Sequence, residues 1–72
     1  MNANIDRQIA CVEREVVSRR RVYPCLVQDG NMSKAKADEE IAVMADVLDT
    51  LRTLKTIADF YASRFKDVVG HG

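Results

Sequence analysis

The sequence lacks tryptophan and contains few glycine, proline or aromatic residues: three Gly, one Pro, two Tyr and two Phe among 72 residues. It also lacks net charge, because eleven basic side chains balance eleven acidic ones. The scarcity of helix-breaking residues favours an all-α fold, and the charge balance argues against duplex nucleic acid or an anionic membrane as a partner. We expect one small domain over residues 1–72, of a size that usually needs a covalent or metal staple or an oligomer, since it buries little surface on its own.

Few residues could bind a metal or act as a nucleophile. The chain has one histidine, His71, and two cysteines, Cys11 and Cys25. On one helix the cysteines would be about 21 Å apart, too far for a disulfide bond, so we expect free thiols in a reducing cytoplasm. Because no base is close in sequence to a Ser or Cys, we predict no enzyme activity, no metal and no cofactor. No apolar run is long enough for a signal peptide or a transmembrane helix.

The longest pattern in the chain predicts a helix over residues 34–69. Apolar residues recur there at steps of three and four, which places them on one face of a helix. Ser33 is a suitable N-cap, because its hydroxyl can accept a hydrogen bond from an unpaired backbone N–H. Thr53 and Thr56 are weak helix formers. A break between them, with residues 57–69 folded back as a third helix, is therefore an alternative.

Apolar residues at the same steps predict another helix over residues 5–29, with Asn4 as its N-cap. Pro24 lies inside this range and removes one helical N–H, so the helix either stops near Val22 or kinks and continues. The apolar face persists beyond the proline, which favours the kink. Residues 30–33 begin with a glycine and have the length of a turn between antiparallel helices.

Folding the chain at this turn predicts an antiparallel helical hairpin. Equal rise along both helices places residues opposite each other when their numbers add up to about 62 or 63. Apolar residues then meet at every level. The arginine run 19–21 lies level with Glu39 and Glu40, and Arg14 lies level with acids of the second helix. We therefore expect these arginines to form ion pairs within the chain.

The second helix is longer than the first, so its apolar end would remain uncovered. An exposed apolar end of this kind usually marks an interface. We predict a homodimer in which two hairpins form a four-helix bundle. The predicted interface residues are Leu54, Ala58, Tyr61, Phe65 and Val68.

A recognisable pattern covers about two thirds of the chain, from residue 5 to about residue 51. It consists of a helix rich in glutamate and arginine, Val22-Tyr23-Pro24, an aliphatic pair, a glycine and Met32, followed by an alanine, Glu40-Ile41 and Met44. This pattern resembles a group of small, mostly uncharacterised proteins encoded by bacteriophages and prophages. The resemblance implies a phage origin and expression inside a bacterium. It implies no activity and supplies no functional residues.

The sequence leads to three hypotheses about function. The first is a non-catalytic interaction protein that binds a host bacterial protein in the host cytoplasm through a helix face, as anti-defence or host-takeover factors do. The second is an oligomeric binder of a nucleotide or cyclic-nucleotide signal, since arginines can hold phosphates, a tyrosine can stack on a base, and helix N-termini favour anions. The third is a structural role in virion assembly. The predicted partner- or anion-binding residues are Arg19, Arg20, Arg21, Tyr23, Lys34 and Lys36.

Overall fold

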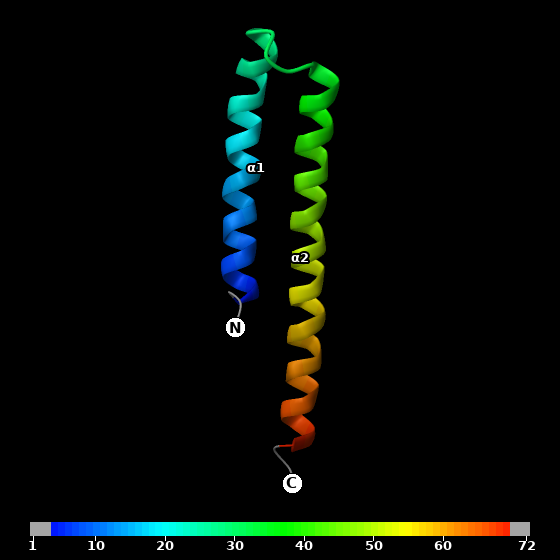
Figure 1. Ribbon diagram of the computed structural model, residues 1–72. Helices are drawn as coiled ribbons and strands as arrows, with labels where there is room; N and C mark the ends of the chain where they lie inside the picture. The colour runs from blue at the N-terminus through cyan, green and yellow to red at the C-terminus, as the bar shows by residue number, and fades with distance from the viewer. Residues whose placement is uncertain (1–3, 70–72) are drawn as a thin grey trace.

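The computed structural model describes the backbone of residues 4–69 and the side chains of residues 4–64. It consists of two helices, α1 (Ile5–Gln28) and α2 (Lys34–Val69), which lie side by side in opposite directions (Figure 1). Within residues 4–69 there is no strand. The predicted all-α helical hairpin is therefore confirmed.

Both predicted N-caps are present. The side-chain oxygen of Asn4 accepts a hydrogen bond from the backbone N–H of Arg7 at 2.9 Å. The hydroxyl of Ser33 accepts from the backbone N–H of Lys36 at 3.1 Å. Each cap satisfies one of the N–H groups that have no partner within the first turn of a helix. The starts of both helices are thus determined locally.

The first helix runs through Pro24 and ends at Gln28, so it does not stop near Val22. Proline leaves the carbonyl of Arg20 without its usual helical donor. Tertiary packing nevertheless keeps the chain helical, because Leu26 and Val27 are both partly buried in the last turn. Continuing the helix therefore covers apolar surface that a stop near Val22 would leave exposed.

The end of α1 is closed by a Schellman motif. The N–H of Gly30 donates to the carbonyl of Val27 at 3.1 Å, and the N–H of Asn31 donates to the carbonyl of Leu26 at 2.9 Å. Gly30 has a φ of 79°, a left-handed conformation that costs glycine little and other residues more. This one residue reverses the chain and allows α2 to return along α1.

The second helix is continuous from Lys34 to Val69, so the alternative with a third helix is wrong. Thr56 is accommodated because its hydroxyl donates to the carbonyl of Arg52, one turn earlier, at 3.0 Å. The low helix propensity of the threonines is a small cost per residue. It does not outweigh the continuity of the surrounding helix.

The core of the hairpin is small. Among the described side chains, only Val16 of α1 and Ala37 and Leu48 of α2 are buried. Three ion pairs join the helices on either side of this core. They are Arg19 with Glu40, Arg52 with Glu13, and Lys55 with Asp6. The numbers of the paired residues add up to values on either side of the predicted 62 or 63, so the register of the hairpin agrees with the prediction.

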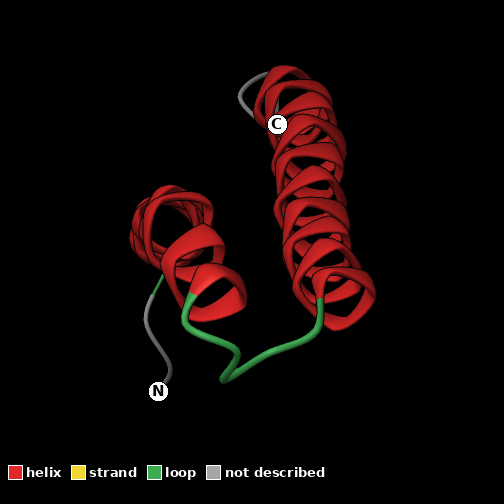
Figure 2. Cartoon of the chain, turned by 90° about the horizontal axis from the view of Figure 1, so that it is seen from above, coloured by secondary structure: helices red, strands yellow, loops and turns green. Residues whose placement is uncertain are grey.

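The molecule is a rod with extents of 63 × 19 × 17 Å. Its accessible surface is 5768 Å², whereas a compact monomer of 8.1 kDa would expose about 4,500 Å². Figure 2 shows why the exposed surface is large. Seen from above, the molecule consists of two helices joined by one turn, and each helix is covered by the other on one side only. In addition, α2 extends well beyond the start of α1 (Figure 1). Much apolar surface is therefore exposed in a single copy.

Candidate functional site

Arg19 lies between the two helices and has more partners than any other described arginine. Its Nε donates to Oε1 of Glu15 at 2.7 Å, and its Nη1 donates to the backbone carbonyl of Glu40 at 3.1 Å. The same Nη1 lies 3.6 Å from Oε2 of Glu40. The guanidinium carbon is 5.7 Å from the centre of the Tyr23 ring, and the Arg19 side chain is 19% exposed. The structure therefore brings together two predicted binding residues, Arg19 and Tyr23.

The charges around Arg19 are balanced within the chain. The hydrogen bond to Glu15 raises the pKa of Arg19 above the ordinary value for arginine. Glu40 also binds Lys36, with Nζ 3.0 Å from Oε1, and this contact raises the pKa of Lys36. Two carboxylates thus hold two cations in one network. An incoming phosphate would have to displace these carboxylates from the groups predicted to bind it.

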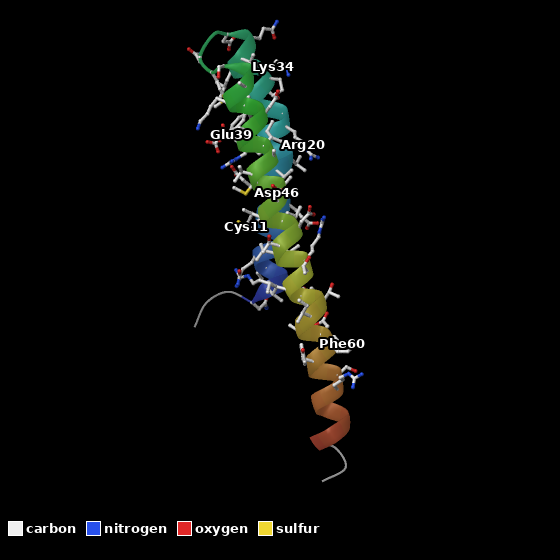
Figure 3. All side chains as sticks on the ribbon, turned by 90° about the vertical axis from the view of Figure 1, so that its right-hand side faces the viewer. Cys11, Arg20, Lys34, Glu39, Asp46 and Phe60 are labelled. Carbon is white, nitrogen blue, oxygen red and sulfur yellow. The ribbon has the colours of Figure 1, made fainter. Side chains whose placement is uncertain are left out.

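Lys34 is separate from this network. Its ammonium group pairs with Asp38 one turn later in α2, at 2.9 Å. Both side chains are largely exposed, and pairs of this kind contribute little to stability. Figure 3 shows Lys34 at the turn end of the hairpin. Its position at the start of α2 agrees with the predicted helix, but its charge is already partnered.

Arg20 and Arg21 are both exposed. Arg20 borders a groove between the helices with Ala45, Leu48 and Asp49 of α2, whereas Arg21 lines a groove formed by α1 residues alone. Neither forms an ion pair with another described side chain, and the same holds for Arg14. The prediction of ion pairs within the chain is therefore right for Arg19 and wrong for the other three arginines. Successive residues on a helix are rotated by about 100°, so Arg19 reaches the carboxylate of Glu40, Arg20 lies at the edge of the contact, and Arg21 lies on the far side of α1.

A row of apolar residues, here called the α2 stripe, follows one side of α2 at steps of three and four. Leu54 is 51% exposed and Tyr61 is 58% exposed. Nearer the turn, the stripe borders a groove of about 560 Å³ between the two helices. The α2 stripe consists of Val47, Leu51, Leu54, Ala58 and Tyr61, and the groove is lined by Arg7, Gln8, Cys11, Val12, Arg14, Val47 and Leu51.

The stripe continues onto the part of α2 that α1 does not cover. There the rings of Phe60 and Tyr61 pack edge to face, with centres 5.7 Å apart and planes at 85°. The guanidinium carbon of Arg64 lies 4.9 Å from the centre of the Phe60 ring. Figure 3 shows Phe60 on this uncovered end. The side chains of Phe65 and Val68, also predicted as interface residues, lie outside the described residues.

Val17 was missed by the reasoning from sequence. It is 65% exposed, more than any other large apolar side chain described. The predicted helix face includes its neighbour Val16, which is buried. An exposed valine next to a buried one can be found from sequence, because it lies one step off the apolar face. Arg14 and Arg21 lie about one turn before and after Val17. The three residues together form a second exposed surface, besides the α2 stripe, that could contact another molecule.

The described residues contain no group of three or more His, Cys, Asp or Glu that could hold a metal ion. Cys11 and Cys25 are both free thiols, as expected, and both are exposed. Neither helix, in its described part, is long and apolar enough to cross a membrane. In comparisons with known proteins, no family model, no curated protein and no solved structure matches this chain.

Proposed function

We propose that this chain is a phage-encoded helical interaction protein that acts without catalysis, by binding a host bacterial protein in the host cytoplasm. The phage origin and the location rest on the resemblance of residues 5–51 described above. Binding of a host protein rests on one observation, the exposed Arg20 and Arg21 of α1, which form no ion pair with another described side chain. The α2 stripe, where Leu54 and Tyr61 are each about half exposed in a single copy, supports a second contact, because exposed apolar surface usually marks an interface.

The α2 stripe is assigned to self-association. Its residues follow the alternating steps of three and four that pack one helix against another. A single copy exposes roughly 1,300 Å² more than a compact monomer of its mass. A stable interface buries about 800 Å² on each partner, so a second copy has sufficient surface to cover. The dimer is a four-helix bundle through Leu54, Ala58, Tyr61, Phe65 and Val68.

The host protein is assigned to the turn-proximal part of α1. Arg20 and Arg21 are exposed and have no acidic partner among the described side chains. They can therefore pair with carboxylates of another protein, and arginine is common in such interfaces. Arg19 instead joins the two helices through Glu40, and Lys36 pairs with the same Glu40 within α2. This division of roles separates the arginine that stabilises the fold from those that bind.

Binding of a nucleotide or cyclic nucleotide is a second candidate. It is favoured by the position of Arg19 beside Tyr23, with 5.7 Å between guanidinium carbon and ring centre. A cation beside an aromatic ring is one way to bind a phosphate next to a base. The carboxylates of Glu15 and Glu40 occupy the same guanidinium, which is why this candidate ranks second.

Copurification from a bacterial lysate tests the proposal. Wild-type protein should retain one host protein in stoichiometric amount. The variant Arg20→Glu/Arg21→Glu should lose that protein and keep its association through the α2 stripe, whereas Leu54→Ser should weaken the association through the stripe. Light scattering reports the mass of each species. The absence of any stoichiometric protein partner, together with a large thermal shift on adding a cyclic dinucleotide, would instead favour the second candidate.

A further inference from the structure

The outer side of α1 carries an exposed valine between two arginines. Val17 is 65% exposed, with Arg14 three residues before it and Arg21 four residues after it. These side chains line a shallow groove of about 280 Å³ together with Glu13 and Ser18. Arg14 and Arg21 form no ion pair with another described side chain. We call Arg14, Val17 and Arg21 the basic patch.

The outer side of α2 carries the same arrangement with the opposite charge. Val43 is 50% exposed, with Glu39 four residues before it and Asp46 three residues after it. Both acids are exposed and form no ion pair with a described side chain. Figure 3 marks Glu39 and Asp46 on α2. We call Glu39, Val43 and Asp46 the acidic patch.

The two patches are complementary when their helices run in opposite directions. In each patch the charged residues are seven positions apart, or about 10.5 Å along a helix, and lie on the same side of it. The basic patch has spacings of three and then four around its valine, and the acidic patch has four and then three. If Val17 lies opposite Val43 on antiparallel helices, Arg14 is level with Asp46 and Arg21 is level with Glu39. Charge and spacing therefore match at all three levels.

We propose that the acidic patch of one copy docks on the basic patch of a second copy. The contact cannot form within one chain. In the hairpin α1 faces α2 with Val16, which is buried, and Val17 is rotated away from that contact by about 100°. Val43 is likewise half exposed in the presence of its own α1. A second copy of this chain carries the matching charges at the required spacing, so the second copy is the partner that fits each patch.

This contact differs in symmetry from the dimer through the α2 stripe. It joins two different patches, so each copy in a pair still has one patch available. Further copies can therefore bind side by side, with their turns at the same end, and form either a closed ring or an open row. Two exposed ion pairs and one valine pair make a weak contact that salt screens. An apolar contact through the stripe would not weaken with salt in this way.

Charge reversal tests the contact and also allows rescue. One variant carries Arg14→Glu and Arg21→Glu, and the other carries Glu39→Arg and Asp46→Arg. Sedimentation velocity at about 0.05 M and about 0.5 M salt, where screening differs several-fold, should show salt-sensitive association of the wild type beyond any salt-resistant dimer. Each variant alone should lose this salt-sensitive component, and an equimolar mixture should regain it. A mixture that stays as dissociated as its components, or a wild type without salt-sensitive association, overturns the proposal.

Cysteine cross-linking tests the register. In a background of Cys11→Ser and Cys25→Ser, one pool of protein carries Val17→Cys and a second pool carries Val43→Cys. After mixing and mild oxidation with diamide, the disulfide between the two pools should exceed the disulfide within either pool. A matched mixture of Val17→Cys with Leu54→Cys should cross-link poorly. Equal yields in all combinations would overturn the proposed pairing of Val17 with Val43. Weakening the stripe with Leu54→Ser should leave this cross-link intact, so the two contacts can fail independently.

Discussion

Leu48 and Leu54 lie on the same helix, but the structure gives them different environments. Leu48 is 8% exposed and packs in the small core, whereas Leu54 is 51% exposed in a single copy. Truncating each to alanine removes the same three carbon atoms. Comparing Leu48→Ala with Leu54→Ala therefore separates packing within one hairpin from packing in the proposed dimer.

The expected costs follow from burial. At about 0.8 kcal/mol for each buried methylene, a fully buried leucine loses about 2.4 kcal/mol on truncation, before any cavity cost. Leu48→Ala should therefore lower the free energy of unfolding by about 2–5 kcal/mol. Leu54→Ala should lower it by about 1 kcal/mol in a single copy, because only half of the side chain is buried. A domain of this length is expected to have a total stability of about 4–11 kcal/mol, so the first loss is a large fraction and the second a small one.

Urea unfolding followed by circular dichroism, at two protein concentrations about a hundred-fold apart, separates the two effects. The cost of Leu48→Ala should be similar at both concentrations. The cost of Leu54→Ala should rise at the higher concentration, where the proposed dimer covers this side chain in both copies. If Leu54→Ala costs as much as Leu48→Ala in the dilute sample, the assignment of Leu54 to the exposed surface is wrong. If its cost stays small at both concentrations, the stripe is not the dimer interface.

Three further predictions concern the turn and the ion pairs. Gly30→Ala should lower the melting temperature by an amount equivalent to about 1 kcal/mol, because φ is 79° and no atom crowds the added methyl group; Gly30→Asn should cost less, and equal stability of wild type and Gly30→Ala would contradict the turn geometry. The ion pair with Asp6 raises the pKa of Lys55 above its ordinary value of 10.5. The stability that this pair contributes should therefore be fully present below pH 10.5 and be lost as the pH rises through the higher pKa of the folded protein. Thermal melts from neutral to strongly alkaline pH should show a smaller loss of stability at alkaline pH in Lys55→Gln than in the wild type, and the same loss in both proteins would count against the pair. Arg19→Met should lower the melting temperature more than Arg20→Met, since only Arg19 binds Glu15 and Glu40; equal effects would contradict the network.

Several features could be predicted from sequence because their causes are local. Asn4 and Ser33 cap their helices through their own backbone neighbours, and Gly30 closes the first helix because few other residues tolerate a positive φ. The steps of three and four in apolar residues are a direct consequence of helix geometry. The hairpin and its register followed from these features together with equal rise along the two helices.

Other features depended on which direction a side chain faces once the helices pack. Sequence placed three arginines level with two acids, but only Arg19 forms an ion pair with α2, whereas Arg20 lies at the edge of the contact and Arg21 on the far side of α1. Level along a helix can be counted from sequence, whereas rotation about its axis relative to a neighbour is known only after packing.

The sequence by itself thus determined the two helices, their N-caps and the height at which residues meet, because each depends on spacing along one chain. The structure decided that the first helix continues through Pro24 and that the second is unbroken. Only the tertiary structure decided that Glu15 and Glu40 hold Arg19, and that oppositely charged patches remain on the two outer sides of the hairpin. The physical reason is that an ion pair needs both distance and direction. A helix supplies the distance from its rise, and the packing of a second helix selects the direction.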